Sequence, residues 1–306
     1  MSATLGAIFA PGFFSSSQVQ IAASVGAVVA VVAGTVGVFT VIRGQSFAGE
    51  ALGDIGTTGG SGSFLVAVGP LWGFAAVAIA AAATMEMLGI QRPRGRDVAT
   101  GVVLGAGLGL AALFFYLIAT NDNTTGATFT IVFGSPFAIT SSSVPLVAAF
   151  SVTALSLIVM LFRPLLLCSI SPELAAGRGI HVRLVGALYL LALAIAVALA
   201  AFTIGTILST ALLVGPAATA LRLTRSPGRA IAAAALIGVG STWLGILMAY
   251  DSYDWPPLGN GWPVSFFVVS LIFVAYLLAG LPRRRRVSST ATGADSAKLA
   301  AEPSRG

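Results

Sequence analysis

The apolar residues of this chain occur in long runs that are separated by short polar segments carrying arginine. A helix needs roughly 20 apolar residues to cross the hydrocarbon core of a bilayer. The pattern therefore predicts an all-α fold, a polytopic transmembrane helix bundle. The first expected spans cover about 19–42, 53–69, 72–90, 98–119 and 144–162, and the last covers about 264–281.

The segment between Arg183 and Arg222 decides the number of spans. Arginine-bearing loops lie on the cytoplasmic side of membranes, so this segment must cross an even number of times. A single helix would be about 60 Å long at 1.5 Å per residue, which is twice the core thickness. We therefore expect two short spans that turn near 202–206, and about nine spans in all. The N-terminus is then outside and the C-terminus cytoplasmic.

Composition limits the class of protein further. Hydrophobic residues make up 57% of the chain and charged residues 8%. The net charge of +6 comes from arginines in alternate loops, which indicates orientation in a lipid membrane and no nucleic-acid partner. With one histidine, one cysteine and no Gly-x-x-x-x-Gly-Lys-Ser/Thr motif, we expect neither enzyme activity nor a bound cofactor. We expect residues 1–286 to form the membrane domain and 287–306 a disordered cytoplasmic tail.

Two acids, Glu50 and Asp54, lie at the start of the second expected span, in a chain that otherwise avoids charge. Side chains four residues apart share one face of a helix, and an acid inside a membrane is a functional-site hypothesis by default. The Gly/Thr/Ser run at 56–63 predicts a break in the helix just after Asp54. Carboxylates and freed carbonyl oxygens suit a divalent cation. The alternative is that both acids lie at the cytoplasmic interface, solvated or paired with Arg43.

Two further segments stand out. Pro172 and Glu173 begin a short expected helix in a polar cytoplasmic loop, where proline suits the first turn and an acid suits the positive helix end. Such a helix could dock a soluble partner or be an ordinary loop helix. Pro216 lies within an expected span among serine and threonine residues. It could bend a helix that lines a pathway, or be a packing kink.

Several motifs together resemble the permease subunits of bacterial ABC importers for zinc, manganese and iron. The residues from Gly34 to Asp54 are similar to the family pattern Gly-x-x-Gly-Val-Phe…Arg…Ser-Phe…Gly-Asp-Ala-Leu-Ser-His. The further matches are Asp97-Val-Ala-Thr-Gly101, Phe133-Gly-Ser135, Ser171-Pro-Glu-Leu-Ala175 with Gly179, and Leu212-Leu-Val-Gly-Pro-Ala-Ala-Thr-Ala220. The resemblance covers about residues 15–282.

The resemblance implies an importer permease in the bacterial cytoplasmic membrane. It implies a second permease copy, two cytoplasmic ATPase subunits that bind ATP, and an extracellular metal-binding solute-binding protein. The family's Asp and His on the metal pathway correspond to Glu50 and Asp54, a change that favours manganese or ferrous iron over zinc. Its ATPase-contacting helix corresponds to Pro172, Glu173, Leu174, Ala175 and Gly179.

Two other classes of protein remain open from the residues. A secondary transporter would use Glu50 or Asp54 as a proton relay and would have no ATPase partner. A membrane scaffold would use both acids only as structural groups.

Overall fold

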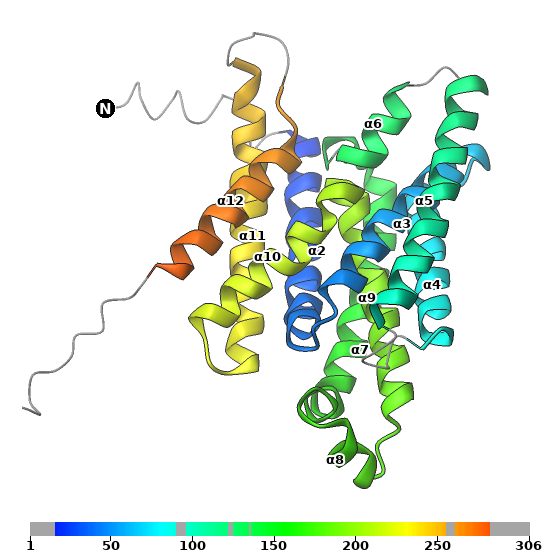
Figure 1. Cartoon of the computed structure of the whole chain (residues 1–306). Helices are drawn as coiled ribbons and strands as arrows, with labels where there is room; N and C mark the ends of the chain where they lie inside the picture. Colours follow the sequence, from blue (N-terminus) through cyan, green and yellow to red (C-terminus); the bar gives the residue numbers. More distant parts are fainter. Residues whose placement is uncertain (1–15, 90–95, 122–124, 135, 255–260, 282–306) are drawn as a thin grey trace, which may run out of the picture.

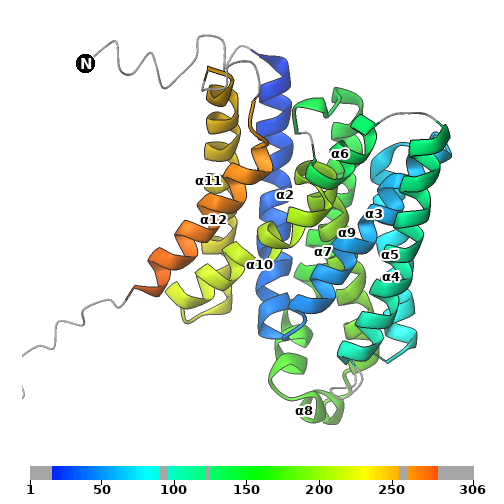
Figure 2. The same ribbon diagram turned by 45° about the horizontal axis from the view of Figure 1, so that its top comes forward.

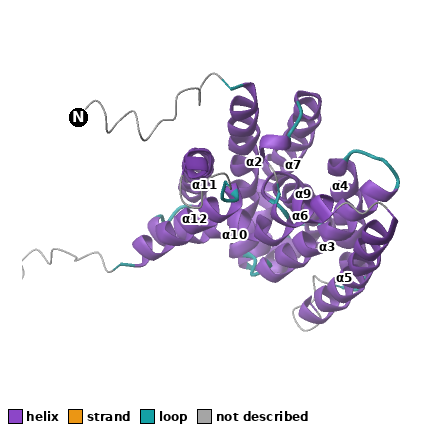
Figure 3. Ribbon diagram, turned by 90° about the horizontal axis from the view of Figure 1, so that it is seen from above, coloured by secondary structure: helices purple, strands orange, loops and turns teal. Residues whose placement is uncertain are grey.

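The computed structural model describes residues 16–89, 96–121, 125–134, 136–254 and 261–281, and every regular element in these ranges is a helix (Figures 1 and 3). The expected tail, 287–306, lies outside the described residues. The longer helices are α2 (Ser17–Ile42), α3 (Ser46–Leu65), α4 (Pro70–Met87), α5 (Arg96–Asn121), α7 (Val144–Ile170), α9 (Val182–Ile204), α10 (Thr206–Leu223), α11 (Pro227–Asp251) and α12 (Val264–Gly280). Two shorter helices are α6 (Thr125–Phe133) and α8 (Pro172–Gly177).

Six helices are long and apolar enough to cross a membrane, namely α2, α4, α5, α7, α9 and α11. The hydropathy of α3 is lowered by its glycine, serine and threonine residues. Helix α12, at 17 residues, is shorter than these six helices. The prediction of a helical multi-pass membrane protein is therefore confirmed.

Helices α2 and α9 form the centre of the bundle. Helix α2 packs against α7, α9, α10 and α11, and α9 packs against α4, α7 and α10. Both are mostly buried along their length, whereas α5 and α7 expose one broad apolar side. Exposed apolar surface on a bundle of this kind suits contact with lipid.

The helix connections lie at two opposite ends of the molecule. The α2–α3 and α10–α11 turns lie at the same end as α8, at the bottom of Figure 1. We call this the α8 end. The α3–α4 connection, the end of α11 and the start of α12 lie at the opposite end (Figure 1). The arginines at 43, 178, 183, 222, 225 and 229 flank helix ends at the α8 end, as expected for loops that share one side of a membrane.

The expected helix break at 56–63 is wrong. Helix α3 runs without interruption from Ser46 to Leu65, so it also begins seven residues before the predicted start of this span at Gly53. Its glycines are used for close packing, because a Cβ at Gly59 would overlap the carbonyl oxygen of Gly73 in α4. Small residues that let backbones approach stabilise helix pairs in membranes, and here this packing outweighs the low helix propensity of glycine.

The expected turn near 202–206 is confirmed. Helix α9 ends at Ile204, α10 begins at Thr206, and Gly205 between them has φ of 89°. A second glycine, Gly134 after α6, has φ of 72° and meets this corner backbone to backbone. A side chain at either position would overlap the other segment, so both glycines are required by conformation and by space.

Candidate functional site

Glu50 and Asp54 lie one turn apart on α3, the helix that runs between α10 and α5 in Figure 2. Glu50 is exposed and Asp54 is half-buried. Phe47, which precedes them on the same side, is 41% exposed. Because α3 is a continuous helix, the prediction that the two acids share a face is confirmed.

Farther along α3 the same side becomes closed. Thr57 and Ser61 are buried, and their hydroxyls donate hydrogen bonds to the carbonyl oxygens of Asp54 and Thr57 respectively. Both hydroxyls therefore use their single donor within α3 itself. This side of α3 is thus exposed around the acids and buried farther along, toward the end of the bundle opposite α8.

A seam of glycines next to the acids holds α3 against α10. A Cβ at Gly49 would lie 2.9 Å from a methyl carbon of Leu213, and one at Gly53 would lie 2.6 Å from the hydroxyl oxygen of Ser209. Since neither position has room for a side chain, α10 fixes the rotation of α3 about its axis. That rotation directs Glu50 and Asp54 away from the protein core.

The two acids alone do not form a complete metal site. Among the described residues, no group of three or more His, Cys, Asp and Glu side chains is placed to hold a metal ion. Manganese and similar hard ions take six or so oxygen ligands. Two carboxylates can supply some of these, and the others must come from water or another chain.

Helix α8 forms a separate projection between α7 and α9, at the bottom of Figure 1. The hydroxyl of Ser171 accepts a hydrogen bond from the amide of Leu174 and donates one to a carboxylate oxygen of Glu173. Pro172 occupies the first turn. These are the features of a capped helix start, so the expected short helix is confirmed.

The rest of α8 combines one anchored residue with an exposed apolar one. Ala175 is fully buried, and its carbonyl oxygen accepts a hydrogen bond from the amide of Ile180. Gly179 makes the return turn with φ of 78°. Leu174 is 63% exposed, which gives this projection an apolar surface residue.

Pro216 lies inside α10 and is buried. Its missing N–H leaves a carbonyl of the preceding turn without its usual partner. The hydroxyl of Thr219 donates to the carbonyl oxygen of Gly215 nearby. A Cβ at Gly215 would overlap a methyl carbon of Ile272 in α12. The segment around Pro216 is therefore packed against α12, and it lies in the helix that also packs against α3.

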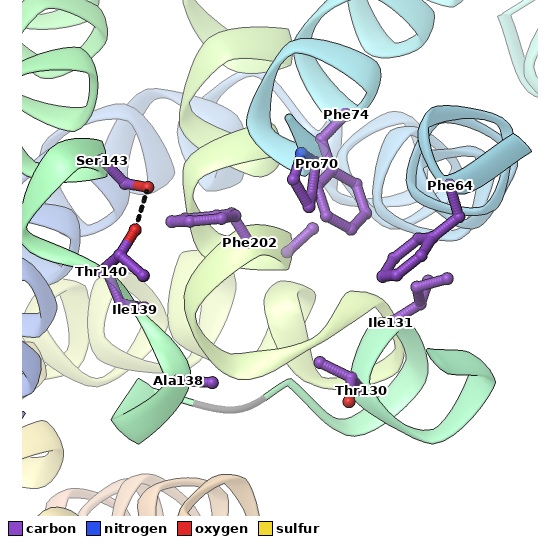
Figure 4. Close-up of a pocket in the computed structure, with 11 residues that line it drawn as sticks. Phe64, Pro70, Phe74, Thr130, Ile131, Ala138, Ile139, Thr140, Ser143 and Phe202 are labelled. Atoms are coloured by element: carbon purple, nitrogen blue, oxygen red, sulfur yellow. Dashed lines mark hydrogen bonds between the residues drawn. The ribbon is translucent and has the colours of Figure 1, made fainter. Parts of the chain in front are cut away.

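A cavity of about 250 Å³ lies at the end opposite α8 (Figure 4). Phe64, Phe74, Ile131 and Phe202 line it, with the hydroxyls of Thr140 and Ser143 at one side. Neither acid lies among its lining residues. This mostly apolar space is therefore distinct from the acid pair.

Sequence reasoning missed two features near the site. Helix α6 was expected to be part of a connection, although its Thr-Phe-Thr-Ile-Val-Phe run was an apolar signal. The buried contact of Tyr189 with Thr40 joins residues 149 positions apart, and no local pattern indicates it.

The fold defines a polytopic helical membrane protein with an acid-bearing helix on an open side and a short helix projecting from one end. The ABC 3 transport family model matches residues 15–279, and the chain belongs to this family. It is therefore a permease component of the metal ABC transporter class, and a multi-pass membrane protein.

Individual relatives carry related names. The manganese transport system membrane protein MntC of Listeria monocytogenes is 28% identical over 272 residues, covering 89% of this chain and 94% of the relative. The zinc uptake membrane protein ZnuB of Haemophilus influenzae is 24% identical, covering 76% and 88%. The solved structure of PsaBC from Streptococcus pneumoniae in complex with Fab has a TM-score of 0.76 at 25% identity, covering 91% of this chain and 95% of that one.

Proposed function

We propose that this chain is the permease of an ATP-driven importer that moves a divalent metal ion into the cytoplasm. The observation that carries the proposal is the acid pair, Glu50 and Asp54, on the open side of α3. An acid in a membrane helix is costly unless it serves a polar route or is paired. Membership of the ABC 3 transport family supports ATP-driven import over proton-coupled transport.

The chemistry of the acid pair favours a hard ion. Carboxylates prefer manganese and ferrous iron, whereas imidazole suits zinc. The names of the relatives include both manganese and zinc systems. We propose manganese as the first substrate to test, followed by iron and zinc.

Two copies of the permease would complete the ion site. If the open sides of α3 from two copies face each other, Glu50 and Asp54 from each copy provide four carboxylates around one axis. Water would supply the remaining ligands. This arrangement would also cover Phe47, whose large apolar side chain is exposed in the single chain.

The proposed orientation places the α8 end in the cytoplasm. Adding α3, α10 and α12 to the six most apolar helices gives nine spans, with the N-terminus outside and the C-terminus inside. Pro172, Glu173, Leu174 and Gly179 would then face an ATPase subunit, while the buried Ala175 would anchor α8 behind them. A solute-binding protein would deliver the ion at the opposite end, and Pro216 would let α10 bend as the dimer alternates between outward and inward forms.

The double variant Glu50→Gln/Asp54→Asn tests the ligand role, because it removes both charges at nearly constant volume. Manganese uptake by the complex in proteoliposomes should fall to the rate of empty liposomes, while assembly with the ATPase is retained. Asp251→Asn, at the opposite end of the bundle, is the matched control and should transport normally. Unchanged uptake by the double variant would contradict the proposal, and uptake without ATPase or ATP would favour a secondary transporter.

A further inference from the structure

A buried polar cluster joins α2, α9 and the α2–α3 turn. Tyr189 of α9 is fully buried, and its hydroxyl donates to the hydroxyl oxygen of Thr40 at 2.8 Å. The Thr40 hydroxyl in turn donates to the carbonyl oxygen of Val36 at 3.0 Å. Each buried hydroxyl thus has a partner, as a stable buried polar cluster requires.

Arg43 extends this cluster into the α2–α3 turn. Its guanidinium carbon lies 5.0 Å from the centroid of the Tyr189 ring, and its Nε faces Oε1 of Gln45 at 3.4 Å. Arg43 is half-buried and Gln45 is 3% exposed. A cation held over an aromatic ring is attracted more strongly when water is partly excluded. We call Thr40, Arg43, Gln45 and Tyr189 the Tyr189 cluster.

The turn itself is held by several backbone hydrogen bonds. The amides of Arg43 and Gln45 donate to the carbonyl oxygens of Phe39 and Thr40, each at 2.9 Å. The carbonyl oxygen of Gln45 then accepts from the amide of Gly49 at 3.0 Å. Gln45 directly precedes the first residue of α3, so a shift of this turn must move the start of α3.

The Tyr189 cluster also touches α3 beside the acid pair. A Cβ at Gly49 would lie 3.6 Å from the methyl carbon of Thr40 and 3.8 Å from a methyl carbon of Leu193. Leu193 lies one turn after Tyr189 on α9, and Gly49 is the residue before Glu50. Two successive turns of α9 therefore contact the acid-bearing helix, one through Thr40 and one directly.

The start of α9 lies next to α8. Helix α8 packs against both α7 and α9, and only the return turn at 178–181 separates α8 from Val182, where α9 begins. Tyr189 is seven residues farther along, which is about 10 Å along a helix axis. One rigid helix thus connects the projecting α8 with the turn that precedes the acids.

We propose that Tyr189 and Arg43 are positioning residues that couple movement of α8 to the placement of Glu50 and Asp54. This inference rests on the proposed function and adds the route by which ATPase contact at α8 reaches the ion site. Coupling between sites is carried by packed side chains and hydrogen bonds on rigid elements. Coupling between two binding equilibria is also reciprocal, so an ion at the acids should change the affinity of α8 for the ATPase through the same cluster.

The test uses Tyr189→Phe, which keeps the ring below Arg43 and removes only the hydrogen bond to Thr40. In the complex with its ATPase in lipid nanodiscs, we expect manganese affinity within about twofold of the parent. Manganese-stimulated ATP hydrolysis should fall on the order of tenfold, which corresponds to about 1.4 kcal/mol in the activation barrier. Tyr116→Phe, at a tyrosine that is 66% exposed on α5, is the control and should leave both values unchanged.

Two more variants separate coupling from a purely structural role. Thr40→Val removes the same hydrogen bond from the other side at nearly constant shape, so it should reproduce the loss of stimulation. Arg43→Gln and Tyr189→Leu should be non-additive when combined. Loss of stimulation with normal assembly, melting temperature and manganese affinity would support the proposal.

Three results would overturn it. Normal stimulation in assembled Tyr189→Phe and Thr40→Val complexes would show that the cluster carries no coupling. Failure of both variants to assemble would assign the cluster to folding. Absence of stimulation in the parent complex, with an active ATPase, would instead contradict the proposed function and remove the basis of this inference with it.

Discussion

Individual glycines set the distances between helices in this protein. At Gly59, a Cβ would overlap the backbone of Gly73, and at Gly37 it would overlap the carbonyl oxygen of Leu213. Other glycines, such as Gly105, have nothing within 4 Å of that position. The residue type alone does not tell a glycine in a close helix contact from a glycine with open space around it. The difference depends on which backbone lies opposite the glycine.

The variant Gly59→Ala should destabilise the α3–α4 contact. The new methyl group meets rigid backbone rather than a mobile side chain, so we expect a loss of about 1–3 kcal/mol. Thermal unfolding of the purified protein in detergent measures this. Gly105→Ala on α5 is the matched control and should melt at or above the temperature of the parent, because alanine is the better helix former. A Gly59→Ala protein that melts as high as the Gly105→Ala protein would refute the packing role of Gly59.

Among single residues, the two acids could be identified from the sequence. Their exposure could not be predicted from it. Their spacing of four residues predicts a shared helical face. The direction in which this face points depends on Gly49 and Gly53, which pack against Leu213 and Ser209 of α10. Because α10 follows α3 by some 150 residues in the chain (Thr206 against Ser46–Leu65), this orientation is a long-range property.

At the scale of elements, α8 is the part most clearly shaped for contact with another protein. It is short, capped by Ser171 and anchored through Ala175, and it leaves Leu174 exposed. An anchored helix with one exposed apolar side chain loses little conformational freedom on binding, which favours affinity.

Leu174→Ala should weaken binding of the ATPase subunit by about tenfold, since truncating a central apolar interface residue costs about 1–2 kcal/mol. Titration of the ATPase onto the permease in nanodiscs measures the dissociation constant. Leu236→Ala is the control, because Leu236 is 75% exposed on α11, away from α8. If both variants bind the ATPase with the parent's affinity, the docking role of α8 is wrong.

At the scale of the whole molecule, α3 runs between α10 and α5 (Figure 2) and bears the exposed Glu50 and the half-buried Asp54. The other exposed surfaces are mainly apolar side chains of α5, α7, α11 and α12. Lipid suits those surfaces, but it does not suit ionised carboxylates. The side of α3 that bears the acids therefore needs either contact with water along a polar route or contact with a second copy of the chain.

A cysteine at Phe47 should form a disulfide between two copies if their α3 helices face each other. Cys168 is the single cysteine of the chain, so Phe47→Cys in a Cys168→Ser background gives a clean experiment. Mild oxidation in membranes should convert most of the protein to a covalent dimer. Leu236→Cys in the same background should remain a monomer, and a monomeric Phe47→Cys protein under these conditions would contradict the proposed interface.

The sequence by itself determined the helical membrane fold, the turn near 202–206, the short helix that begins at Pro172 and Glu173, and the spacing of Glu50 and Asp54. These features depend on apolar run length, arginine placement and cap residues, which act within a few turns of the chain. The tertiary structure alone decided that α3 continues through its glycines, that its acids face outward, and that Tyr189 reaches Thr40. Those outcomes depend on which backbone lies opposite each residue, and contacts between distant segments have no counterpart in local periodicity.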